Sequence, residues 1–130
     1  MSVDVNWADE ARTIVRYSFA GMWNWDEFYI ALDRALEMEN SVSHRVDVVA
    51  DLRRSERIPS DALSHVQIIA RKQPANLQLS VFVTNSLFAR ALLGVLRPIS
   101  KTVSNHYRIV PDLERAYTEI QADRRERKQV

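Results

Sequence analysis

The first apolar and polar positions of the chain alternate as they do in β-strands. Val3, Val5 and Trp7 alternate with polar residues, and after a polar break at residues 8–11 the alternation resumes between Thr13 and Phe19. Strict alternation over four to eight residues is typical of a strand with one covered face. Ile14 is the apolar residue that falls out of phase. We therefore expect a pair of antiparallel strands with one solvent-facing side.

A helical spacing of apolar residues follows Gly21, which ends the second strand. Asn24 is a good N-cap and Glu27 stands three residues after it, so we expect a helix from about Trp25 to Glu39. Apolar runs bounded by Pro, Asn and Asp then predict three further strand–helix units. The expected strands are Val46–Ala50, Leu77–Val83 and Tyr107–Val110; the expected helix caps are Ser60, Asn85 or Ser86, and Asp112.

The alternation of strands and helices predicts an α/β fold class. Parallel neighbours joined by right-handed crossovers are the usual outcome of such an order. We expect a mixed, mostly parallel sheet of about five strands with about four helices. Residues 1–123 form a single domain in this prediction, and residues 124–130 form a charged C-terminal tail.

Composition narrows the classes of function. The 18 basic and 17 acidic residues give a net charge of +1, which supplies no global field for nucleic acid. The absence of cysteine excludes disulfides, thiolate metal sites and cysteine nucleophiles. Two glycines are too few for a Walker loop or a dinucleotide fingerprint, because phosphate-cradling loops need several. We therefore expect no cofactor.

The remaining sequence signals favour a cytoplasmic protein that is not an enzyme. The first five residues lack the basic start of a secretory signal, and no apolar run has the ~18 residues of a membrane span. His44, His65 and His106 do not have metal-ligand spacing, and no serine sits in a nucleophile elbow.

Three segments resemble the STAS family, which includes anti-sigma-factor antagonists and small stand-alone bacterial domains. They are a strand end with a Trp-led helix start at Phe19–Phe28, a strand ending in Asp-Leu at Arg45–Leu52, and a helix start at Val110–Ala116. The resemblance spans about Val5 to Ile120. It implies a STAS-like α/β domain that regulates a protein partner by direct contact rather than by catalysis.

The resemblance also implies a phosphorylation site at Ser60. Relatives carry a phosphorylated serine, in an Asp-Ser-x-Gly stretch, at the start of the second helix. Here Ile58–Ala62 lacks the preceding Asp and the following Gly. Phosphate would be favourable at a helix N-terminus, and the alternative is a plain N-cap serine.

A charged segment after the third strand is a candidate binding site. Asp51, Arg53, Arg54 and Arg57 should meet the Thr84–Ser86 loop at the carboxyl edge of the sheet, where α/β proteins usually bind ligands. Arginine forks there could bind an anion or an acidic partner segment. The alternative is a solvated loop whose ion pairs contribute little.

The expected third helix is apolar nearly all round. Leu87, Phe88 and Leu92 belong to a segment with few polar positions between Asn85 and Arg97. A surface helix normally carries one apolar stripe, so the second apolar face would meet a homodimer partner, a target protein or an apolar ligand. The alternative is cover by residues 98–105.

Trp23 and Trp25 flank the start of the first helix. Their apolar bodies and polar tips suit the mouth of a pocket, and simple core packing is the alternative. Together with Phe88 and Leu92 they support a second hypothesis. STAS-like folds resemble lipid carriers, so the chain would be a carrier or sensor that binds an apolar small molecule or lipid beside the third helix.

Overall fold

The computed structural model describes residues 2–96 and 107–128, and its order of elements is the predicted one. The α/β fold class is confirmed. The elements are β1 (Val3–Trp7), β2 (Ile14–Gly21), α1 (Trp25–Asn40), β3 (Val46–Ser55), α2 (Ala62–Lys72), β4 (Leu77–Val83), α3 (Leu87–Leu96), β5 (Tyr107–Val110) and α5 (Leu113–Lys128).

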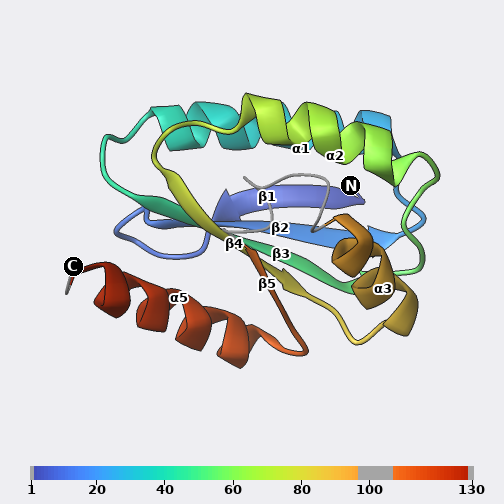
Figure 1. The fold of residues 1–130 in the computed structure, drawn as a ribbon. Helices are drawn as coiled ribbons and strands as arrows, with labels where there is room; N and C mark the ends of the chain where they lie inside the picture. The colour runs from blue at the N-terminus through green and yellow to red at the C-terminus, as the bar shows by residue number, and fades with distance from the viewer. Residues whose placement is uncertain (1, 97–106, 129–130) are drawn as a thin grey trace.

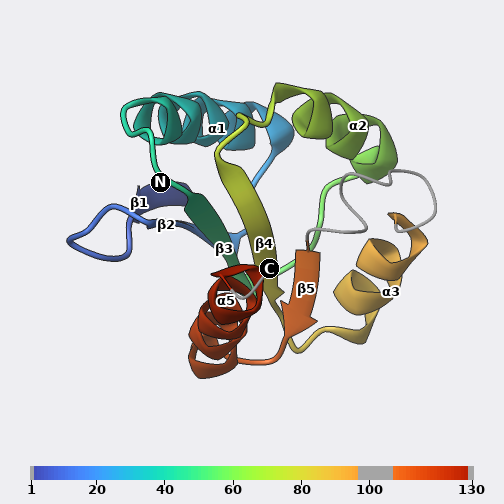
Figure 2. The same cartoon turned by 60° about the vertical axis from the view of Figure 1, so that its left-hand side comes forward.

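The strands form one mixed sheet in the order β1-β2-β3-β4-β5. β1 and β2 are antiparallel, with Val5 opposite Tyr17, whereas each later pair is parallel. Helices α1 and α2 lie over one face of this sheet and α5 lies under the other (Figure 1). Helix α3 lies to the side, beyond β5 (Figure 2). The two faces of the sheet are therefore covered by different helices.

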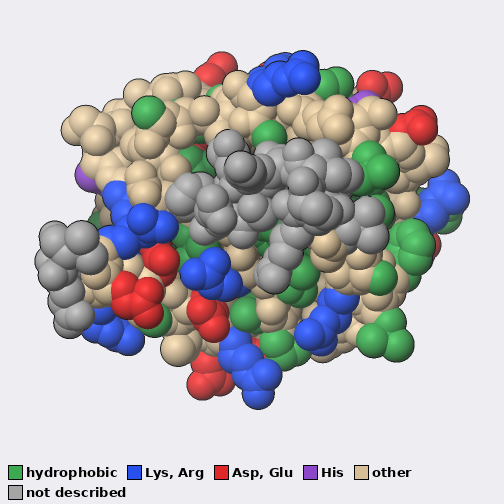
Figure 3. Space-filling model, viewed as in Figure 1, with side chains coloured by type: hydrophobic (Ala, Val, Ile, Leu, Met, Phe, Trp, Pro, Cys, Tyr) green, Lys and Arg blue, Asp and Glu red, His purple; other side chains and the backbone are tan. Residues whose placement is uncertain are grey.

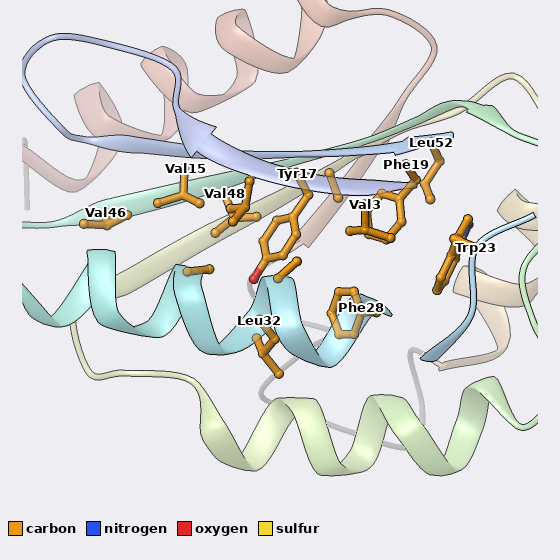
Figure 4. Close-up of a cluster of buried hydrophobic side chains, with 14 residues drawn as sticks. Val3, Val15, Tyr17, Phe19, Trp23, Phe28, Leu32, Val46, Val48 and Leu52 are labelled. Carbon is orange, nitrogen blue, oxygen red and sulfur yellow. The ribbon is translucent and has the colours of Figure 1, made fainter. Parts of the chain in front are cut away.

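Two apolar cores result from this layering. Between α1 and the sheet, the rings of Tyr17 and Phe28 stack 5.7 Å apart and Phe19 packs beside them (Figure 4). On the other face, Ile14 and Val49 pack with Ile120 of α5. Because α5 covers that face at the start of β2, Ile14 is buried although it breaks the alternation of its strand.

Three of the four described helices begin at an N-cap residue that the sequence predicts. Asn24 Oδ1 accepts a hydrogen bond of 2.8 Å from the amide of Glu27, as expected of an N-cap. Asp112 accepts one of 2.8 Å from Arg115, and the Ser86 hydroxyl accepts one of 3.2 Å from Ala89. Each of these caps satisfies an amide that lacks an intrahelical partner.

The start of α2 differs from the prediction. The residue before the helix is Asp61, which has a left-handed φ of 65° and makes no side-chain cap hydrogen bond. Ser60 lies one position further out and is exposed, so the expectation that Ser60 caps this helix is wrong.

Strand β3 continues past its expected end at Ala50. It runs to Ser55, so Arg53 and Arg54 are strand residues rather than loop residues. Leu52 is buried while its neighbours Asp51 and Arg53 are more exposed, which is the alternation of a strand with one covered face. Pairing with β2 extends equally far, with Gly21 opposite Ser55.

Helix α5 continues through most of the expected tail. It is helical to Lys128, and residues 129–130 lie outside the described part. Its last turns are held by the fully buried Asp47, whose carboxylate accepts hydrogen bonds from Arg124 at 2.9 Å and from Arg45 at 2.9 Å. Asp123 accepts a bond of 2.6 Å from the same Arg45. These paired charges fasten α5 to the start of β3.

Candidate ligand-binding pocket

A hollow of about 300 Å³ lies between α2 and the sheet, and we call it the α2 pocket. Its floor includes Gln78, Ser80 and Phe82, which alternate along β4 and so share one face of the strand. Tyr107 of β5, opposite Ser80 in the register, continues the floor. This volume is at the lower end of the range of small-molecule pockets in proteins.

One face of α2 forms the roof of the α2 pocket. Ala62 is the buried residue of this helix, whereas the rest of the face is partly exposed. Leu63 of the same helix is 39% exposed. The roof residues recur at helical spacing and are Ala62, Val66, Ile69, Ala70 and Gln73. Helix α2 therefore covers a space, although Val66 and Ile69 also pack against the apolar clusters beside it.

The two predicted tryptophans form an aromatic wall of the pocket. Their rings meet edge to face, 5.1 Å apart and at 84°. Trp23 is buried and its indole N–H donates a hydrogen bond of 2.8 Å to Ser55 Oγ. The indole N–H of Trp25 donates one of 2.7 Å to the carbonyl oxygen of Ser60. Because both indole N–H groups are hydrogen-bonded, the rings are held in place and present apolar surface to the pocket.

A histidine and a tyrosine join α1 to α2 beside this wall. The ring of His65 stacks on Trp25 at 4.3 Å, and its Nδ1 lies 2.7 Å from the hydroxyl of Tyr29. This pair was not predicted from the sequence, because the two residues are 36 positions apart and no local pattern joins them. The contacts fix the relative position of the two helices at one end of the pocket.

The described lining of the α2 pocket contains no charged side chain. Its polar members beside the indoles are Gln73, Gln78, Ser80 and Tyr107. The Gln73 amide donates to the Ile69 carbonyl at 3.0 Å, and the Tyr107 hydroxyl donates to the Leu93 carbonyl at 2.5 Å. The pocket is therefore apolar and neutral, with a small number of hydrogen-bonding groups.

Helix α3 contributes to the pocket with one side and exposes another. Leu92, one of the candidate residues, and Leu93 line the α2 pocket. Leu87 is 83% exposed and Phe88 is 66% exposed, and both lie outside that lining. Cover of α3 by residues 98–105 was the alternative, and these residues lie outside the described part of the chain.

Phe88 instead lines a second hollow, of about 280 Å³, at the carboxyl edge of the sheet. Arg57, Thr84 and Ser86 line it as well, so the segment after β3 and the segment after β4 do meet there. Asp51, Arg53 and Arg54 are not part of this lining. The predicted charged cluster is thus divided between two places.

Asp51 and Arg53 pair with each other on the exposed side of β3. Arg53 donates to the two carboxylate oxygens of Asp51 over 2.9 Å each. Burial raises the pKa of Asp51, but the hydrogen bonds and the charge of Arg53 outweigh it and hold the pKa below its usual range. Because the pair neutralises itself, it offers little free charge to an anion. On the face of the molecule shown in Figure 3, acidic and basic side chains are interspersed.

The histidines that the structure describes do not come together in a common site. His44 contacts the carbonyl oxygen of Arg12 at 2.8 Å, far along the chain from the His65 pair, and His106 lies outside the described residues. Within residues 2–96 and 107–128 no group of three or more His, Cys, Asp or Glu side chains could hold a metal ion. In the same ranges no helix combines the length and the apolar character needed to cross a bilayer.

A buried carboxylate on α1 was also not predicted from the sequence. Glu39 is 1% exposed, and neither of its side-chain oxygens has a hydrogen-bond partner among the described residues. Burial raises the pKa of Glu39 to about 7. Its position seven residues after the buried Leu32 places it on the inner face of α1, and this spacing was the available signal.

Comparison with protein-family models, curated proteins and solved structures found no match to this chain. The STAS-like resemblance therefore stays a prediction from the sequence.

Proposed function

We propose that this chain is a STAS-like domain that binds an apolar small molecule in the α2 pocket, as a carrier or sensor and without catalysing a reaction. The observation that carries the proposal is the aromatic wall. Trp23 and Trp25 are fixed by hydrogen bonds and border a neutral space of about 300 Å³. Pockets of this kind bind ligands mainly by removing apolar surface from water.

The chemistry of the lining supports binding over catalysis. Acid–base catalysis needs a titratable group within hydrogen-bond reach of the reacting atoms. The described lining of the α2 pocket contains no carboxylate, histidine or cysteine, and its one titratable hydroxyl, on Tyr107, is engaged by Leu93. A bound molecule would therefore be held rather than converted.

The test is a fluorescence titration with N-phenyl-1-naphthylamine, a neutral apolar dye that brightens when it leaves water. We expect saturable binding to the wild-type chain. Ala70→Phe and Val66→Phe place a ring in the α2 pocket and should weaken binding at least about tenfold, because an occupied cavity cannot accept the dye.

The matched control is Ala91→Phe, which changes an exposed helical alanine outside the pocket lining. It should bind the dye like the wild type. Equal binding by all four proteins, or no binding by the wild type, would refute the proposed function. Thermal unfolding of each variant identifies any that fails to fold.

Protein contact is a second candidate function, and the exposed surface of α3 favours it. Leu87 and Phe88 are adjacent, are 83% and 66% exposed, and stand next to the hollow lined by Arg57. Adjacent large apolar side chains on a surface often mark a protein interface. This is the surface through which a regulatory domain would contact a target or a second copy of itself.

Sedimentation velocity over a range of concentrations tests the self-association form of this candidate. A dimer that Leu87→Ser and Phe88→Ser abolish would assign the surface to a homodimer. A monomer at every concentration would exclude the second copy as the occupant.

A further inference from the structure

The α2 pocket has a polar end as well as an aromatic one, and this asymmetry deepens the proposed function. In a central parallel strand both faces are normally covered and apolar. The face of β4 toward α5 follows that rule with Leu79, Val81 and Val83, which are all buried. The face toward the pocket does not, because it begins with Gln78 and Ser80.

Gln78 and Ser80 are available to a ligand. Neither side chain has a hydrogen bond within the described part of the chain, and both are partly exposed in the lining of the pocket. By contrast, the amide of Gln73 and the indole N–H groups of the two tryptophans already have partners. Two open hydrogen-bonding groups thus lie side by side on the floor, one strand pleat apart.

The aromatic wall lies at the other end of the same strands. Phe82 is opposite Ala50 on β3, and Trp23 bonds to Ser55, five residues further toward the carboxyl edge. From Gln78 to Phe82 the floor alone extends roughly 13 Å, at about 3.3 Å per strand residue. The pocket is therefore elongated, polar at the amino end of β4 and aromatic at the carboxyl end of β3.

We propose that the ligand of the α2 pocket is an uncharged, elongated molecule. Its apolar ring or ring-like end packs against Trp23 and Trp25, and its neutral hydrogen-bonding group, such as an amide, a hydroxyl or a ketone, meets Gln78 and Ser80. This proposal rests on the proposed function. A charged headgroup is disfavoured because the described lining has no opposite charge to pair with it, and an unpaired buried charge is costly.

The test compares three probes with one ring system: 2-naphthamide, 2-methylnaphthalene and 2-naphthoate. Binding is followed by quenching of tryptophan fluorescence. In the wild type we expect 2-naphthamide to bind at least about tenfold more tightly than the charged 2-naphthoate. Gln78→Leu and Ser80→Ala, singly and together, remove the two hydrogen-bonding side chains from the floor of the pocket.

In the double variant the affinity for 2-naphthamide should fall about threefold to tenfold, the range of one hydrogen bond, whereas the affinity for 2-methylnaphthalene should stay equal or increase. Gln67→Leu changes an exposed glutamine of α2 outside the lining and should alter neither affinity. The single variants keep the test valid if the double variant does not fold.

The outcomes distinguish the inference about the polar end from the proposed function of the α2 pocket. Suppose that the wild type binds the neutral probes and that the variants change both affinities equally or not at all. The polar end then has no role and the inference is wrong, whereas binding in the α2 pocket is still supported. Preference for 2-naphthoate would also overturn it. If the wild type binds none of the probes, the inference and the proposed function fail together.

Discussion

The indole N–H of Trp25 donates a hydrogen bond of 2.7 Å to the carbonyl oxygen of Ser60 and so connects the first turn of α1 to the segment that leads into α2. It acts together with the contacts of His65 to Trp25 and Tyr29, and the inner face of α2 beside these contacts borders the α2 pocket. This one bond therefore helps to determine the width of the α2 pocket.

Trp25→Phe should lower the free energy of unfolding and weaken dye binding together. The substitution keeps an aromatic ring but removes the N–H, and we expect a loss of about 1 kcal/mol because a typical hydrogen bond contributes that much. Urea unfolding and the N-phenyl-1-naphthylamine titration measure the two effects. Trp7→Phe, outside the pocket lining, is the control and should leave the dye affinity unchanged.

Glu39 should make the stability of the protein fall as the pH rises. Burial raises the pKa of Glu39 from an ordinary value of 4.5 to about 7, so between these values the folded chain holds a proton that the unfolded chain has released. Stability from this group is complete below about pH 4.5 and is lost through pH 7. The difference corresponds to roughly 3 kcal/mol.

Glu39→Gln removes this dependence. The variant should be more stable than the wild type at pH 8, and the gain should shrink as the pH is lowered toward 4.5. Urea unfolding of both proteins from pH 4.5 to pH 8 measures it. A constant difference between the two proteins across this range would show that Glu39 does not titrate as described.

Asp47, which is buried, and Asp51, which is partly buried, should differ in their contribution to stability. Asp47→Asn leaves Arg45 and Arg124 without the buried carboxylate that both contact, and breaking such a pair typically costs about 3 kcal/mol or more. Asp51→Asn disrupts a more exposed pair and should cost less than about 1 kcal/mol. Similar losses in thermal or urea unfolding would contradict the assignment of Asp47 as the anchor of α5.

Local signals in the sequence were sufficient for most of the fold. Asn24 and Asp112 cap their helices as expected, because an N-cap acts on an amide only three residues away. The paired charges of Asp47 and Arg124 join residues 77 positions apart, and no local pattern indicates such a contact. Residues 124–130 were therefore predicted as a charged tail, although residues 124–128 belong to α5.

The candidate site was predictable in part for the same reason. Trp23 and Trp25 were identified at the start of α1, and Leu92 in a helix that is apolar nearly all round; the structure brings all three to the α2 pocket. Phe88 was grouped with them as a lining candidate, but its position in α3 turns it outward together with Leu87. Gln78 and Ser80 were passed over because they fit the alternation of a strand, in which polar residues usually face water.

The most direct measurement of the central claim is a ¹H–¹⁵N spectrum recorded during titration with N-phenyl-1-naphthylamine. The three tryptophans give three indole signals, of which Trp23 and Trp25 border the pocket and Trp7 does not. We predict that the indole signals of Trp23 and Trp25 and the amide signals of Gln78 and Ser80 shift together, while that of Trp7 stays fixed. Shifts confined to Leu87 and Phe88, or no shifts at all, would contradict binding in the α2 pocket.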